Sequence, residues 1–159
     1  MTGHSATRTQ TMPQSRLHQP QLDLAGWPLH AALHLGALPT APGCGRAWTR
    51  QILREWSLDR LADDSELLVS ELTTNAVQAS ASLADAAIGL WLASDSERAV
   101  ILVWDPSPQP PEPANPGQDT EDGRGLLLVQ ALSLQWGWYF PASASLDGHA
   151  GKVVWAIVG

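Results

Sequence analysis

The sequence predicts a two-layer α/β sandwich, in which helices cover one face of a mixed, mostly antiparallel sheet. Three features of the 159-residue chain support this fold class. Two helical patterns follow one another near the start, and two short apolar runs then come in direct succession. A third helical pattern precedes two further strand-like runs. This order differs from the regular β–α–β alternation of a doubly wound parallel sheet, and the length suits one domain with a proper core.

The start of the chain differs in composition from the rest. Residues 1–20 are rich in Thr, Gln, Ser, His and Pro and contain little to bury, so we expect a disordered tail. We expect the folded domain over residues 21–159. Its first element, residues 29–38, mixes apolar residues with His and Ala in a pattern typical of an edge strand, which Pro39 and Pro42 end.

The first helix is expected over residues 43–57, with apolar side chains on one side. Arg46, Arg50 and Arg54 repeat every four residues on a different face. A solvated helix face is the simpler interpretation of this basic row. Contact with a protein partner or a phosphate group is the alternative.

The second helix is expected over residues 63–80. Asp63 is suited to cap it, and Glu66, three residues later, is suited to bond back to its start. One face of this helix carries an apolar stripe that faces the core. The stripe consists of Leu68, Leu72, Ala76 and Ala79.

Glu71 and Asn75 lie four residues apart, so they are neighbours at the edge of that stripe. In one interpretation Glu71 extends to solvent and Asn75 caps a bend. In the other, a carboxylate and an amide reach from the border of the core into a cleft. The rest of the chain favours the second interpretation.

The runs 86–92 and 99–104 predict two adjacent strands or a β-hairpin, and the second strand ends in Asp105. Residues 106–122 contain six prolines and almost no apolar residues. Such a segment forms neither a helix nor a central strand. Because it lies between an acidic strand end and a glycine turn, we expect a mobile lid.

A third helix is expected from Gly123 to Leu132, because two glycines open an apolar stretch. Such a helix start offers free backbone N–H groups and the positive end of the helix dipole to a phosphate. Residues 134–140 predict the next strand. The β-branched content of residues 152–158 predicts a buried closing strand.

Composition excludes several classes of protein. The formal net charge of -7 argues against direct nucleic-acid binding. Cys44 is the single cysteine, so there is no intrachain disulfide and no cysteine-based zinc cluster. The polar N-terminus does not resemble a signal peptide, and the best apolar run, 99–104, is too short to span a bilayer. We therefore expect a cytoplasmic protein without a membrane partner.

Four pieces of sequence occur in a set order, and together they resemble the motifs of a known family. They are Glu71-x-x-x-Asn75, Asp105 at a strand end, Gly123-Arg-Gly125 before a helix, and Gly151-Lys-Val-Val-Trp155 on the last strand. They resemble the Bergerat-fold, or GHKL, ATPases, which include the catalytic domains of histidine kinases. Within that superfamily the chain is most similar to the stand-alone anti-sigma-factor serine kinases of the RsbW and SpoIIAB type.

The resemblance implies ATP and Mg²⁺ as cofactors and a role for each matching residue. Glu71 would be the catalytic general base, and Asn75 would hold Mg²⁺ through its amide oxygen. Asp105 would accept a hydrogen bond from the amino group of adenine, and residues 106–122 would be the ATP lid. The start of the third helix would lie against the nucleotide, through Gly123, Arg124, Gly125 and Leu126. For Arg124 and Lys152, a phosphate contact and a surface charge are both open.

The resemblance also implies a function and partners. The chain would be a serine/threonine protein kinase that acts on an anti-anti-sigma protein, sequesters a sigma factor and so regulates transcription; a homodimer is compatible with this. The alternative is an ATP-gated binding regulator that transfers no phosphate. A third interpretation is a copy that binds no nucleotide, against which the presence of both Glu71 and Asn75 argues. The chain departs from many relatives at Gln78 and Ala79, where they carry a His or Arg.

Overall fold

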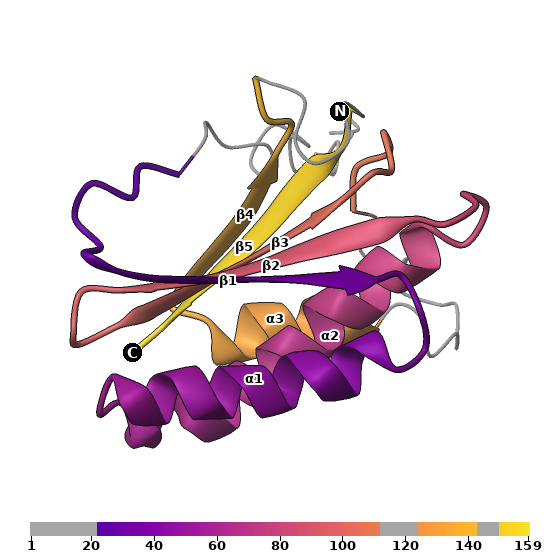
Figure 1. Ribbon diagram of the computed structural model, residues 1–159. Coiled ribbons are helices and arrows are strands. Elements are labelled where there is room, and N and C mark those ends of the chain that lie inside the picture. The colour runs from indigo at the N-terminus through magenta and orange to yellow at the C-terminus, as the bar shows by residue number, and fades with distance from the viewer. Residues whose placement is uncertain (1–21, 112–123, 143–149) are drawn as a thin grey trace, which may run out of the picture.

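The computed structural model describes residues 22–111, 124–142 and 150–159, which form a two-layer α/β sandwich (Figure 1). Five strands make one sheet in the order β1-β2-β3-β5-β4, with every neighbouring pair antiparallel. The strands are β1 (Leu29–Gly36), β2 (Ala87–Ser94), β3 (Ala99–Asp105), β4 (Gln135–Tyr139) and β5 (Lys152–Val158). The helices α1 (Ala41–Glu55), α2 (Ala62–Ala79) and α3 (Arg124–Leu132) all pack on one face of the sheet. The fold class predicted from the sequence is confirmed.

The position of each strand in the sheet explains its burial. β3 is the central strand and β5 is the interior strand beside it, and every residue in both is buried. β1 lies at one edge and alternates half-buried and exposed residues, as an amphipathic edge strand does. The predicted edge strand and hairpin are therefore confirmed, and the closing strand spans the predicted residues.

The sheet buries apolar side chains on both faces, and the eight tryptophans divide between them. The core under the helices contains or contacts Trp48, Trp56, Trp136 and Trp138. The opposite face contains or contacts Trp27, Trp91, Trp104 and Trp155. The high tryptophan content thus supplies large side chains to fill two apolar layers.

The basic row of α1 contacts α2 of the same chain. The guanidinium of Arg50 donates to Glu66 at 2.6 and 2.7 Å and to Asp63 at 2.9 Å. Arg46 donates to the hydroxyl of Ser70 at 2.9 Å. All three arginines of the row are exposed, which is the solvated helix face of the simpler interpretation, and Arg46 and Arg50 also join α1 to α2.

Two predicted helix boundaries need correction. α2 begins at Ala62 with Leu61 as its N-cap, and no side chain caps it. The predicted capping pair of Asp63 and Glu66 is wrong, because both carboxylates pair with Arg50 instead. Pro42 lies in the first turn of α1 rather than in a loop that ends β1, and proline is favoured there because the first helical N–H groups have no partner.

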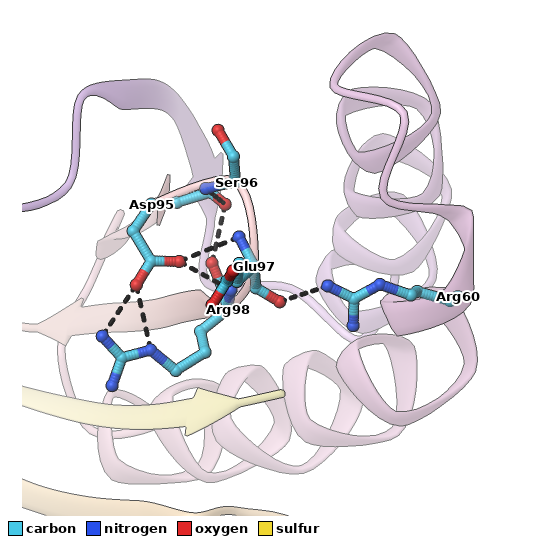
Figure 2. A network of polar contacts seen from close by, with 6 residues as sticks. Arg60, Asp95, Ser96, Glu97 and Arg98 are labelled. Atoms are coloured by element: carbon cyan, nitrogen blue, oxygen red, sulfur yellow. Dashed lines mark hydrogen bonds and ion pairs between the residues drawn. The ribbon is translucent and has the colours of Figure 1, made fainter.

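A polar network closes the turn between β2 and β3 (Figure 2). One oxygen of Asp95 accepts from the backbone N–H groups of Glu97 and Arg98, at 3.0 and 2.7 Å. The other oxygen accepts from the guanidinium of Arg98 at 2.7 and 2.9 Å. Arg60, on the short 3-10 helix η2 (Asp59–Leu61), donates to the carbonyl of Glu97 and so ties the turn to the helical layer.

Two expectations concern other parts of the chain. The predicted tail, residues 1–20, lies outside the described residues. In the described part of the chain, no helix combines the length and the apolar character needed to cross a membrane.

Candidate functional site

A cleft of about 360 Å³ lies between the C-terminal half of α2 and the sheet. This volume is within the range of small-molecule sites, roughly 300–1,000 Å³. The ends of β3 and β5 that carry Asp105 and Lys152 form one wall. α2 contributes Asn75, and α3 contributes Leu126, from its first turn.

The structure brings Glu71 and Asn75 of α2 together with Gly125 of α3. The two α2 side chains are half-buried and lie one helical turn apart. A Cβ atom placed on Gly125 would lie 2.7 Å from Oε2 of Glu71 and 3.5 Å from Oδ1 of Asn75. The close approach of α3 to these two groups therefore depends on the missing side chain of Gly125.

Asp105 and Lys152 form a buried ion pair in the wall of the cleft. They are directly opposite in the antiparallel register of β3 and β5, and their exposed fractions are 2% and 4%. The Nζ atom of Lys152 donates to Oδ1 of Asp105 at 2.8 Å, and the backbone N–H of Ser107 donates to the same oxygen at 2.9 Å. Burial raises the pKa of Asp105 above its ordinary value, while the Lys152 ammonium and the Ser107 amide oppose that rise.

Gly151 fixes the backbone beside this pair. A Cβ atom on Gly151 would lie 2.2 Å from the carbonyl oxygen of Asp105 and 2.6 Å from Nε1 of Trp104. Backbone and indole atoms cannot move away as a flexible side-chain end can. The start of β5 is therefore held against the end of β3 with little freedom.

The structure places the remaining predicted site residues as follows. Leu126 is buried and lines the cleft. Arg124 begins α3, but its side chain lies outside the described part, as does all of Gly123. Of the predicted lid, residues 106–111 are described, and Pro110 and Pro111 line the cleft; residues 112–122 lie outside the described part.

Lys152 is the residue whose place sequence reasoning missed. A surface charge was one interpretation, and that is wrong, because the side chain is buried. A phosphate contact was the other, but its ammonium contacts the carboxylate proposed to bind the base. The available signal was a lysine at the first position of a strand that is otherwise entirely apolar.

The amide oxygen of Asn75 and the backbone N–H groups at the start of α3 are suited to Mg²⁺ and to a nucleotide. Mg²⁺ takes few protein ligands and keeps several waters, so one amide oxygen from Asn75 together with phosphate oxygens is sufficient. The described residues contain no cluster of three His, Cys, Asp or Glu side chains that would hold a metal without such a ligand. A helix start offers backbone N–H groups without an intrahelical partner, and α3 begins at Arg124 with glycine as its second residue.

Comparison with known proteins identifies a family for most of the chain. The model of the histidine kinase-like ATPase domain family matches residues 37–139, from the end of β1 through β4. The matched part includes Glu71, Asn75, Asp105 and Gly125. A search of the curated proteins finds no match.

Proposed function

Because the chain belongs to the histidine kinase-like ATPase domain family, we propose that it binds Mg-ATP and uses it to phosphorylate a serine or threonine of a partner protein. The partner would be an anti-anti-sigma protein, and the chain would also sequester a sigma factor. Family membership supports the use of ATP. The partners rest on the resemblance of the motifs to stand-alone anti-sigma-factor kinases.

One observation carries the proposal: Gly125 of α3 lies against both Glu71 and Asn75 of α2. A carboxylate, an amide and the N-terminal turn of a helix thereby lie together beside a cleft, where the carboxylate would accept a proton and the amide would bind a metal ion. Phosphoryl transfer needs a positioned nucleophile and charge neutralisation more than covalent catalysis by the protein. These are the groups that such a reaction requires.

In the proposed reaction, the partner's hydroxyl group attacks the terminal phosphate of ATP. The oxygen of the partner's hydroxyl group forms a bond to the γ-phosphorus of ATP. The bond from that phosphorus to the oxygen bridging to the β-phosphate breaks, and ADP leaves with its electron pair. The hydroxyl proton passes to a carboxylate oxygen of Glu71, which acts as general base. Asn75 would hold Mg²⁺, which when bound offsets the negative charge of the phosphates.

Asp105 would determine which nucleobase the site prefers. A ligand that donates an N–H to a buried carboxylate binds more tightly than one that leaves the carboxylate without a hydrogen bond. The amino group of adenine is such a donor. We therefore expect ATP to bind more tightly than GTP.

A calorimetric titration of the full chain with Mg-ATP and with Mg-GTP tests the site. ATP should bind, GTP should bind more weakly, and Asn75→Ala should lose the dependence of binding on Mg²⁺. Glu66→Gln is a matched control, because Glu66 lies on the same helix but pairs with Arg50. Equal affinity for the two nucleotides would contradict the adenine assignment.

A second candidate function is an ATP-gated binding regulator that transfers no phosphate. It is favoured by Pro110 and Pro111, which line the cleft at the start of the predicted lid, so a bound nucleotide would touch this segment directly. Capture of partners from native cytosol with and without Mg-ATP, followed by a phosphate-transfer assay, separates the two. Transfer to a captured partner supports the kinase. A change of partner without transfer supports the regulator.

A further inference from the structure

The chain contains a single lysine, Lys152, and its ammonium group is buried at the cleft. A buried lysine without a partner would be costly, and here the carboxylate of Asp105 is that partner, at 2.8 Å. Even so, a buried ion pair is an inefficient way to stabilise a fold. Removing two charges from water costs several kcal/mol per ion, and apolar replacements are often equally stable or more so.

The pair has hydrogen-bonding capacity left for a ligand. Both contacts to the Asp105 carboxylate go to Oδ1, from Lys152 and from the N–H of Ser107. Neither of these hydrogen bonds from described residues goes to Oδ2. An ammonium group has three N–H donors, and in the described part of the chain only the one directed at Asp105 is used.

An acceptor and a donor therefore stand side by side in the wall of one cleft. A ligand that fits them has a donor next to an acceptor along one edge. Adenine has this pattern, because its amino group lies between the ring nitrogens N1 and N7, both of which accept. A phosphate group does not fit, since the adjacent Asp105 carboxylate would repel it.

Resting on the proposed ATP site, we propose that Lys152 is a specificity-determining residue that donates a hydrogen bond to a ring nitrogen of the adenine whose amino group donates to Asp105. The base is then read by two residues from neighbouring strands, one accepting and one donating. Their spacing is fixed by the register of β3 and β5 and by the tight packing of Gly151.

The proposal is tested by a cycle that removes the donor from the protein and the acceptor from the ligand. The full chain and its Lys152→Met variant are titrated with Mg-ATP, 7-deaza-ATP and 1-deaza-ATP in a calorimeter. Arg60→Met is the control, because it also replaces a cationic side chain by methionine, at a residue that contacts the β2–β3 turn. Its affinities should equal those of the wild type.

For the wild type, we expect one of the two analogues to bind about 10- to 100-fold more weakly than ATP, the loss typical of one hydrogen bond to a charged group. Lys152→Met should lose a similar factor for ATP and nothing further for that analogue. If the affinity loss caused by Lys152→Met and the loss caused by the analogue multiply when combined, the proposal is overturned, because Lys152 would then act only by holding Asp105. Equal binding of ATP and both analogues by the wild type would also overturn it.

Two further measurements complete the test. Adenosine should lose the same factor as ATP in Lys152→Met; a loss confined to ATP would mean that Lys152 contacts phosphate, which overturns the proposal. Should Lys152→Met fail to fold, wild-type protein labelled with ¹⁵N-lysine gives one Nζ signal. That signal should shift with ATP and not with the weaker analogue, and an equal shift with both would overturn the proposal. Failure of the wild type to bind any adenine nucleotide would instead refute the proposed function itself.

Discussion

The two ends of the proposed nucleotide site, the base end and the phosphate end, are built from different kinds of structure. At the base end, Asp105 and Lys152 lie opposite each other on the neighbouring interior strands β3 and β5, both buried and joined at 2.8 Å. At the other end, Glu71 and Asn75 lie half-buried on a helix, against Gly125 of a second helix. The first arrangement is fixed by backbone pairing, and the second by how two helices pack.

Because of this difference, we expect changes at the two ends to affect different properties of the protein. The ladder between β3 and β5 holds the base end in place before a ligand arrives, so changes there should alter stability and nucleotide affinity. In the proposed function, the groups at Glu71 and Asn75 would act on the reacting phosphate. Changes there should alter rate more than stability, because a general base contributes chiefly in the transition state.

The largest expected effect is that of Glu71→Gln. The amide keeps the shape of the side chain but cannot take a proton, so the rate of phosphate transfer should fall on the order of 10²–10⁴-fold. ATP affinity should change little. Single-turnover transfer to a captured partner and calorimetry check the two parts, with Glu66→Gln as control. A parallel loss of affinity and rate would show that the two ends are not separable in this way.

Asp105→Asn should instead act on stability. It leaves the Lys152 ammonium buried without a carboxylate, at an expected cost of about 3 kcal/mol in the free energy of unfolding. Urea denaturation measures this loss. Adding Lys152→Met should restore part of it, since the double variant buries no charge at this position. ATP binding should also weaken, by about one to a few kcal/mol, because a charged hydrogen bond is lost.

Gly125→Ala tests the close approach of the two helices. Its Cβ would lie 2.7 Å from Oε2 of Glu71, the end of a flexible side chain that can move aside. Stability should therefore change by less than about 1 kcal/mol, and alanine also favours the helix. The rate should still fall, by about 10²-fold, because the general base is displaced. A loss of stability with an unchanged rate would place the role of Gly125 in packing alone.

The smallest effect is expected at Asp95, whose ion pair with Arg98 is partly open to solvent. Hydrogen bonds from the backbone and side chain of Arg98 lower its pKa from 3.8 to about 2. Its carboxylate thus stabilises the fold above pH 3.8, and this contribution is lost as the pH falls through 2. Asp95→Asn should cost about 1 kcal/mol at pH 7 after screening by solvent.

Denaturation of Asp95→Asn measured between pH 7 and pH 2 should show a correspondingly weaker pH dependence than that of the wild type. Nucleotide binding should be unchanged, because Asp95 lies in the β2–β3 turn and not in the cleft (Figure 2). Altered ATP affinity in this variant would mean that the turn is coupled to the site.

The sequence by itself determined the order and type of the elements. Periodic patterns identified α2, and continuous apolar runs identified β3 and β5, because burial of one face or of both faces leaves a direct trace in residue spacing. It also identified Glu71 and Asn75 as neighbours, since residues four apart on a helix are adjacent whatever the rest of the chain does. The family match includes both.

Only the tertiary structure decided which distant groups meet. Asp105 and Lys152 are 47 residues apart, and their ion pair depends on the register of β3 against β5. Glu66 pairs with Arg50 rather than capping α2, because α1 packs alongside it. Gly125 meets Glu71 only because α3 packs on α2. Local sequence determines the periodicity within one helix or strand. Contacts between distant segments depend on strand register and on how the layers pack, and the residue spacing within a segment does not reveal them.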